Sequence, residues 1–415
     1  MLKIRMPELC VAFSPPAGAA SPLVSSELRP PETMRQLFRI LAAFCLLLSF
    51  EAQADTPDRV EAVVVTSPAG GVRLNGTLRL PTGPGPFPAA VLLPEHGAGT
   101  LAPTTADTQL LTNLTDYLVN QGIAVLRLQE RDPNSSTATT LAERTADATA
   151  ALNYLRTHSQ VDVAHLGLIG HGEGANVALL AGAQPLAPAF VVALAATGLP
   201  GRELLATQAA MYGKVLHDST AALHQRSYQL AQQETEQEAA GMRAKGSNAA
   251  QVQMYLDQQH LRLKATMRHN EESLVKHQRA MLEIVRQTPD NAQAQAILSN
   301  MLRQYYPTVA ATDVQTTVQL LTSPTYRSYL NFDPQPTLAQ VNCPVLLLQG
   351  DNDTEVNPSV NLPLLRKGLR HNGQVAELRF PGLNHALQFT ASAADAAPSP
   401  IAASDIRVWI LSQKK

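Results

Sequence analysis

One glycine-rich turn carries the strongest chemical signal in this sequence. An apolar run over residues 166–169 leads into Gly170-His171-Gly172-Glu173-Gly174. A strand that enters G-x-S-x-G and leaves as a helix places its central residue on a strained turn above a sheet, where serine can attack a carbonyl carbon. Here Gly172 stands at the serine position, so this turn offers no attacking side chain.

Two later residues could act with such a turn. Asp353 follows the apolar run 345–349, and His385 ends Pro381-Gly382-Leu383-Asn384-His385 just after the run 375–380. A carboxylate at Nδ1 of a histidine holds the ring in the tautomer whose Nε2 accepts a proton. The chain order of nucleophile position, acid and histidine matches that of a hydrolytic triad on a parallel sheet. We predict that Gly172, Asp353 and His385 meet at one sheet edge.

Acyl transfer also needs backbone N–H groups that stabilise a developing oxyanion. The residue after the nucleophile supplies one of them, which here is Glu173. A second source is expected in His96-Gly97-Ala98-Gly99, which follows the apolar run 89–93 and Glu95. Glycine allows a backbone to turn close to a bound carbonyl. We therefore predict that the backbones at Gly97 and Ala98 complete the oxyanion hole.

Strands that alternate with helices should position these residues. Short apolar runs recur along the chain and predict strands at 89–93, 123–128, 166–169, 190–194, 345–348 and 375–380. Helical segments separate them, including one from about Thr140 to His158, which favours a largely parallel sheet with helices on both faces. Two earlier β-rich stretches, 60–65 and 72–80, flank Pro68-Ala69-Gly70-Gly71 and predict a hairpin. The sequence predicts an α/β fold.

The segment 201–342 has a different pattern. Gln, Ala, Glu and Arg dominate it, and apolar residues recur at multiples of helical spacing. We predict a helical cap inserted into a core of residues 55–200 and 343–415. Its histidines do not pair at i,i+4 and have no cysteine or clustered carboxylate partners, so we expect a solvated helix face and no metal or cofactor. These histidines are His217, His224, His260, His269 and His277.

The N-terminus has the features of an export signal. Met34–Arg39 is positively charged, residues 40–50 are apolar, and Ala52-Gln53-Ala54 is typical of a cleavage site. We expect residues 1–33 to be an upstream extension, residues 34–54 a signal peptide cleaved after Ala54, and the mature chain to be periplasmic or secreted without a membrane anchor. Only Cys343 then remains, and we expect it to be buried.

Composition narrows the partners. The 415 residues carry a formal net charge of −2 and 5% aromatic residues, and basic runs are absent. This balance disfavours a nucleic-acid partner, which would need a positively charged face and stacking platforms.

From about Phe87 onward, the sequence resembles the bacterial α/β-hydrolase superfamily, in the group related to dienelactone hydrolases and acyl-peptidase-like esterases. Gly167–Gly174 is similar to the family's G-L-I-G-H-S-E-G. Further matches are Pro344–Gly350 with Asp353, Pro381–His385 and Ser323–Arg327. The resemblance implies an α/β-hydrolase fold, with Asp353 as acid, His385 as base and Gly172 at the nucleophile position. Leu128-Gln129-Glu130-Arg131-Asp132 departs from the family's Asp-x-Arg-Gly loop.

The favoured hypothesis is a hydrolase that has lost its nucleophile and still binds a small ester or acyl ligand. An active esterase is an alternative, through water activated by His385 or through Ser135, Ser136 or Thr100. A second alternative is dinucleotide binding, because Gly170-x-Gly172-x-x-Ala175 also fits G-x-G-x-x-G/A. A third is a ligand-binding module without catalysis. Gly172→Ser should create esterase activity if Asp353 and His385 are in place.

Overall fold

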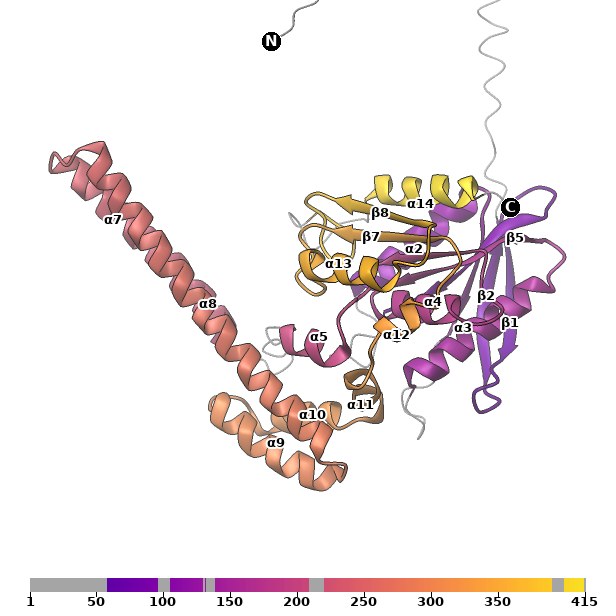
Figure 1. Ribbon diagram of the computed structural model, residues 1–415, viewed down its shortest axis with the longest axis horizontal. Coiled ribbons are helices and arrows are strands. Elements are labelled where there is room, and N and C mark those ends of the chain that lie inside the picture. The colour runs from indigo at the N-terminus through magenta and orange to yellow at the C-terminus, as the bar shows by residue number, and fades with distance from the viewer. Residues whose placement is uncertain are drawn as a thin grey trace, which may run out of the picture. The chain divides into compact units, whose positions relative to one another are not determined.

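The computed structural model describes residues 58–95, 105–129, 131, 139–208, 220–389 and 399–413. Eight strands form one sheet in the order β1-β2-β4-β3-β5-β6-β7-β8 (Figure 1). Their bounds are β1 Arg59–Thr66, β2 Arg73–Leu80, β3 Phe87–Leu93, β4 Ala124–Leu128, β5 Val161–His171, β6 Phe190–Leu194, β7 Val345–Gly350 and β8 Val375–Phe380. The strands predicted from the apolar runs are all present.

The sheet is parallel except at one edge. Strands β4, β3, β5, β6, β7 and β8 pair parallel to one another, whereas β1 pairs antiparallel with β2, and β2 antiparallel with β4. The predicted hairpin is confirmed, with Thr66 opposite Arg73 in β1 and β2. Gly70 and Gly71 adopt φ values of 75° and 65° in its turn, a conformation that favours glycine.

Helices cover both faces of the sheet, as predicted. One buried cluster joins the sheet to α3 (Leu141–Arg156), α4 (Glu173–Gly182) and α13 (Pro358–Gly368). A second cluster, on the other face, joins it to α2 (Thr105–Asn120) and α14 (Pro400–Ser412). Cys343 is buried in the first cluster, as expected for a small apolar side chain.

Among the described residues between β6 and β7, helices are the regular elements, and turns and loops join them. Its helices are α5 Gly201–Thr207, α7 Thr220–Ala244, α8 Ala249–Gln287, α9 Asn291–Tyr305, α10 Ala311–Leu321, α11 Pro324–Leu330 and α12 Gln335–Leu338. The C-terminal half of α8 packs with α5, α9, α10 and α11 in a third buried cluster, which also includes Leu141 and Val177 from the helices on the sheet. The N-terminal half of α8 packs on α7 through a separate small cluster.

Helix α3 begins with a complete capping box. The Thr140 side chain accepts from the backbone N–H of Glu143, and the Glu143 carboxylate accepts from the backbone N–H of Thr140. The predicted helix, from about Thr140 to His158, is found at Leu141–Arg156.

The predicted extension 1–33 and signal peptide 34–54 lie outside the described residues. Within the part of the chain that the structure describes, a search for helices long and apolar enough to cross a membrane finds none.

Candidate active site

Gly172 lies at the junction of β5 and α4, on the turn that the sequence predicts. Its backbone has φ 53° and ψ −117°, a left-handed conformation that favours glycine over residues with a Cβ. Its N–H donates to the carbonyl of Leu194 on β6 (2.9 Å), and its carbonyl accepts from Ala175 at the start of α4 (3.1 Å). The chain therefore makes the sharp strand-to-helix turn of a nucleophile elbow and presents no side chain from it.

Asp353 and His385 lie together, in the loops that follow β7 and β8. Nδ1 of His385 donates to Oδ2 of Asp353 at 2.7 Å. Asp353 is buried and held from several sides: its Oδ1 accepts from the backbone N–H groups of Glu355 and Val356 (both 2.8 Å), and its Oδ2 accepts from the Gln349 side chain (2.6 Å). These bonds fix the carboxylate, which in turn orients the imidazole of His385.

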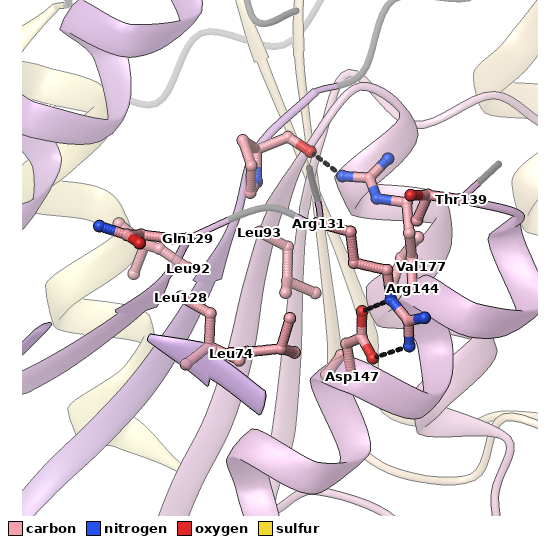
Figure 2. A pocket seen from close by; sticks show the side chains of 12 residues that line it. Leu74, Leu92, Leu93, Leu128, Gln129, Arg131, Thr139, Arg144, Asp147 and Val177 are labelled. Atoms are coloured by element: carbon pink, nitrogen blue, oxygen red, sulfur yellow. Dashed lines mark hydrogen bonds and ion pairs between the residues drawn. The ribbon is translucent and has the colours of Figure 1, made fainter. Parts of the chain in front are cut away.

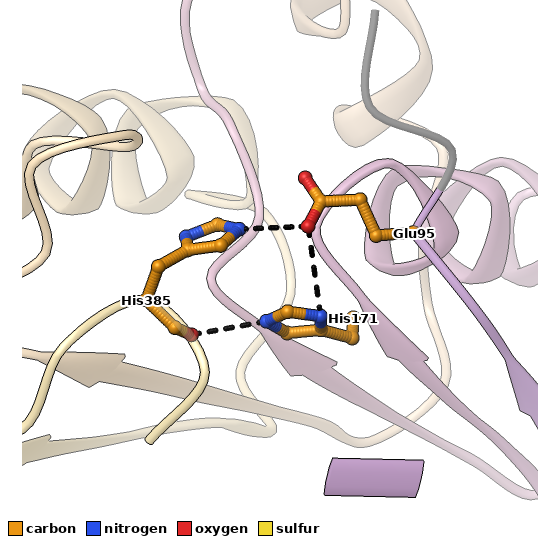
Figure 3. Close-up of side chains that lie close together, drawn as sticks. All are labelled: Glu95, His171 and His385. Carbon is orange, nitrogen blue, oxygen red and sulfur yellow. Dashed lines mark hydrogen bonds and ion pairs between the residues drawn. The ribbon is translucent and has the colours of Figure 1, made fainter. Parts of the chain in front are cut away.

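Glu95 was not among the site residues predicted from the sequence. Its carboxylate lies beside Gly172, and its Oε2 is 3.1 Å from Nε2 of His385 (Figure 3). A Cβ built on Gly172 would lie 2.5 Å from both Cδ and Oε1 of Glu95. The glutamate therefore occupies the space into which a nucleophile side chain at position 172 would extend.

Strand register explains this placement. β3 and β5 are parallel neighbours, and Leu93 pairs with Gly170. Two residues further along each chain bring Glu95 beside Gly172. The sequence does show a polar residue, Glu95, just past the end of a predicted central strand. That this residue lies beside Gly172 follows only from the pairing of β3 with β5.

His171, the last residue of β5, completes the group. Its Nε2 is 3.0 Å from the backbone carbonyl oxygen of His385, and because a carbonyl only accepts, this nitrogen carries the proton. Its Nδ1 faces Oε2 of Glu95 at 3.8 Å. The ring is fully buried, with its centroid 4.7 Å from that of His385.

Opposite charges dominate the electrostatics of this group. Burial alone would raise the pKa of Glu95, but the charge and hydrogen bond of His385, with the charges of His171 and Arg144, outweigh it and lower this pKa to about 2. Burial alone would lower the pKa of His385, but the charges of Glu95 and Asp353 outweigh it and hold that pKa well above its usual value. His385 therefore donates a hydrogen bond to a carboxylate from each of its ring nitrogens.

A buried arginine ties the turn to the strand that carries Glu95. Arg144 donates from Nη1 to Oε1 of Glu173 and from Nη2 to the carbonyl of Pro94, both at 2.7 Å. Glu173, whose backbone was predicted to serve the oxyanion hole, thus also contributes a buried ion pair. Its backbone lies at the start of α4, as that role requires.

Several other predicted residues lie outside the described part of the chain. These are the second predicted oxyanion source, Gly97 and Ala98, and the three substitute nucleophiles, Thr100, Ser135 and Ser136.

A pocket lies next to this group, at the ends of β3 and β4 (Figure 2). Its apolar wall consists of Leu74, Leu92, Leu93, Leu128 and Val177. Its polar wall holds Arg144 and a two-pronged ion pair in which Arg131 donates from Nε and Nη2 to Asp147, at 2.8 and 2.7 Å. Arg131 belongs to the segment that departs from the Asp-x-Arg-Gly pattern, and its guanidinium is buried.

The helical segment also reaches this site. Tyr329 of α11 is buried, and burial, followed by the negative charges of Glu173 and Glu95, raises its pKa well above the usual value. Helix α11 therefore lies close enough to the site for the two carboxylates to act on its tyrosine.

The alternative function predicted for the turn at Gly172 is dinucleotide binding. In that fingerprint the second glycine lets a pyrophosphate approach the backbone closely. At Gly172 this approach is filled by the Glu95 side chain, whose negative charge would repel a phosphate. The arrangement disfavours a pyrophosphate at this turn.

Comparisons with known proteins find a partial similarity to an esterase. No protein-family model matches the chain. The chain is 32% identical over 108 residues to Esterase EstD of Thermotoga maritima, and this match spans 25% of each protein, so the chain covers a quarter of that relative's length.

The solved structures that are similar to the chain include the following two. Est1E from Butyrivibrio proteoclasticus is 12% identical, with a TM-score of 0.44 over 85% of this chain and 98% of that one. The Pyrococcus furiosus esterase Pf2001 is 12% identical, with a TM-score of 0.46 over 86% of this chain and 89% of that one.

The topology of the sheet by itself supports an α/β-hydrolase fold. A largely parallel sheet carries a sharp turn after a central strand, a carboxylate after a later strand and a histidine after the last strand. These elements follow one another in the chain order of the α/β-hydrolase triad. The chain therefore has an α/β-hydrolase fold and resembles ester hydrolases.

Proposed function

We propose that this protein is an ester-hydrolase-like α/β-hydrolase that has lost the serine acyl-enzyme mechanism and keeps a site for a small ester or acyl ligand. One observation carries the proposal. The carboxylate of Glu95 fills the space beside Gly172 and is hydrogen-bonded to Nε2 of His385, the nitrogen that would accept the nucleophile's proton.

The serine route needs a hydroxyl at position 172 and a proton-accepting Nε2 within its reach. Gly172 has no hydroxyl, and Nε2 of His385 is already hydrogen-bonded to the Glu95 carboxylate. Neither requirement is therefore met. In serine proteases, loss of the nucleophile lowers kcat by about 10⁶-fold and leaves a rate about 10³ to 10⁴ above that in water. A remnant of this size does not sustain a dedicated esterase.

A pocket near the turn supports ligand binding. The pocket at the ends of β3 and β4 has an apolar wall and two arginines, Arg131 and Arg144, in its polar wall. Both arginines already donate to other residues of the protein, so it is the apolar wall that suits a small ligand, through the apolar part of that ligand. Tyr329 of α11 lies near the carboxylates of Glu173 and Glu95.

The first test asks whether any serine still acts as nucleophile. The full chain, with a metal chelator present, is treated with a fluorophosphonate probe and assayed with p-nitrophenyl butyrate. We expect no labelling and no burst of nitrophenol. Labelling that maps to a serine, whether at positions 135–136 or elsewhere, would overturn the proposal.

The second test restores the nucleophile. Gly172→Ser alone should stay inactive, because the new side chain meets the Glu95 carboxylate. This expectation differs from the one drawn from the sequence, which did not include Glu95. In the double variant Gly172→Ser/Glu95→Ala, both the space and Nε2 of His385 become available, and we expect fluorophosphonate labelling at position 172 and a rise in esterase rate of roughly 10²-fold or more.

Glu95→Ala alone is the matched control for the double variant, and it should remain unlabelled because it has no hydroxyl on the turn. Circular dichroism shows whether each variant is folded. A folded double variant that is neither labelled nor active would contradict the claim that Gly172 and Glu95 together account for the lost mechanism.

A further inference from the structure

We propose that Glu95, His171 and His385 bind one divalent metal ion, with zinc as the best match, at the place where the nucleophile of the turn would otherwise lie. Each residue offers one ligand atom, and the three atoms lie within 4.8 Å of one another. They come from the end of β3, the end of β5 and the loop after β8, so the sheet itself brings them together (Figure 3).

The donor set fits zinc. Two imidazoles and one carboxylate are a known set for catalytic zinc sites, in which three protein ligands leave a fourth position for water or a ligand. Zinc binds imidazole nitrogen and carboxylate oxygen at about 2.0 to 2.2 Å, which puts the ligand atoms of a tetrahedral site roughly 3 to 4 Å apart. Here Oε2 of Glu95 is 3.1 Å from Nε2 of His385 and 3.8 Å from Nδ1 of His171.

The supporting contacts also fit a metal site. A histidine that binds a metal usually donates its other N–H to a carboxylate or a backbone carbonyl, which fixes the tautomer and the ring. In His385 that partner is Asp353, at 2.7 Å from Nδ1. In His171 it is the backbone carbonyl of His385, at 3.0 Å from Nε2. Both rings are thus held with their ligand nitrogen directed toward Glu95.

Charge balance is the third argument. The carboxylate of Asp353, which is buried, and that of Glu95, which is partly buried, both flank His385, so they carry one negative charge more than a protonated His385 ring balances. Buried charges are costly unless they are matched or bind a metal. A dication with two neutral histidines would balance both carboxylates, and the metal would take the place of the proton shared by His385 and Glu95.

This inference goes beyond the proposed loss of the serine mechanism and does not depend on it. The fluorophosphonate test is run with a chelator and reports on serine alone, whereas metal binding is measured directly. The absence of a metal was predicted from the histidines of the helical segment alone, and this group lies outside that segment. His277 of that segment stacks instead on Tyr305, with ring centroids 3.9 Å apart.

The experiment is a zinc titration of the full chain, prepared without a polyhistidine tag and dialysed against a chelator. Isothermal titration calorimetry should give one zinc ion per chain. The conservative variant Glu95→Gln keeps the size of the side chain and loses its charge, and His171→Gln loses a ring nitrogen. We expect each to weaken zinc binding at least 10-fold, and the control His277→Gln to leave it unchanged.

Asp353→Asn tests the supporting contact, since loss of such a partner typically weakens metal binding 10- to 100-fold. Cobalt gives an independent readout, because Co²⁺ bound by two imidazoles and a carboxylate has a visible absorption spectrum that Glu95→Gln should alter. A folded wild-type chain that binds no zinc overturns the proposal. So does zinc binding that is unchanged in Glu95→Gln and His171→Gln, because the ion then lies elsewhere.

Discussion

Arg144 shows how much of this site depends on a single side chain. It joins the first residue of α4 to the segment that carries Glu95, through Glu173 and the carbonyl of Pro94. Its side chain is 9% exposed and that of Glu173 is 6% exposed, so neither charge is well solvated. For an ion pair this deeply buried, the largest effect on stability comes from removing one partner, which leaves the other charge buried alone.

We predict that Arg144→Met lowers the free energy of unfolding by about 3 to 5 kcal/mol, because the charge of Glu173 stays buried without this partner. Urea denaturation followed by circular dichroism measures the change. The double variant Arg144→Met/Glu173→Gln removes both charges and should recover part of the loss. If Arg144→Met costs less than 1 kcal/mol, the pair does not hold the two segments together.

At the scale of elements, the helix that carries Arg144 owes its first turn to local chemistry. The capping box of Thr140 and Glu143 satisfies backbone N–H groups that α3 would otherwise leave without partners. The helix is 16 residues long and ends at Arg156, shortly before β5 begins at Val161. Arg144 is the fourth residue of this helix and directly follows the capped positions.

We predict that Thr140→Ala destabilises the protein by about 1 kcal/mol, the usual cost of losing an N-cap hydroxyl. Thr149→Ala in the same helix is the control. Among the described residues, the Thr149 hydroxyl donates to the carbonyl of Thr145 within the helix. Alanine is the better helix former, so we expect little change or a small gain. Equal losses in both variants, measured by thermal unfolding, would argue against the cap.

For the molecule as a whole, the buried clusters predict how stability is distributed. The sheet and its helices share two large clusters, and the C-terminal half of α8 joins a third with α5 and α9 to α11. Among the described side chains, the N-terminal half of α8 contributes to a small buried cluster with α7, formed by Ala239, Val252 and Leu256. Regions with few buried apolar contacts open locally at lower free energy than the core.

We predict that Val252→Ala and Val285→Ala, two buried valines of the same helix, behave differently. Val252→Ala should raise amide hydrogen exchange in α7 and the first half of α8 and leave the melting temperature of the sheet nearly unchanged. Val285→Ala lies in the cluster shared with α5 and α9 to α11 and should lower global stability by about 1 to 3 kcal/mol. Exchange followed by mass spectrometry, with thermal unfolding, separates the two outcomes. Equal effects on the melting temperature would contradict this division.

Local sequence patterns were sufficient for the elements and for part of the site. The apolar runs predicted the strands, and Gly172 lies on the predicted turn. Because Asp353 and His385 each follow a later strand, the sequence predicted that they meet. In the structure, Nδ1 of His385 lies 2.7 Å from Oδ2 of Asp353. These features depend on short stretches of chain and on the rule that parallel strands end at one edge.

Glu95 and His171 could not be assigned in the same way. Both are single polar residues at strand ends, a position with many structural uses, and their role depends on which strands are neighbours. The sequence by itself determined the α/β elements, the turn without a side chain and the Asp353–His385 pair. The tertiary structure decided what replaces the missing side chain, because only the pairing of Leu93 with Gly170 brings residues 77 positions apart into contact.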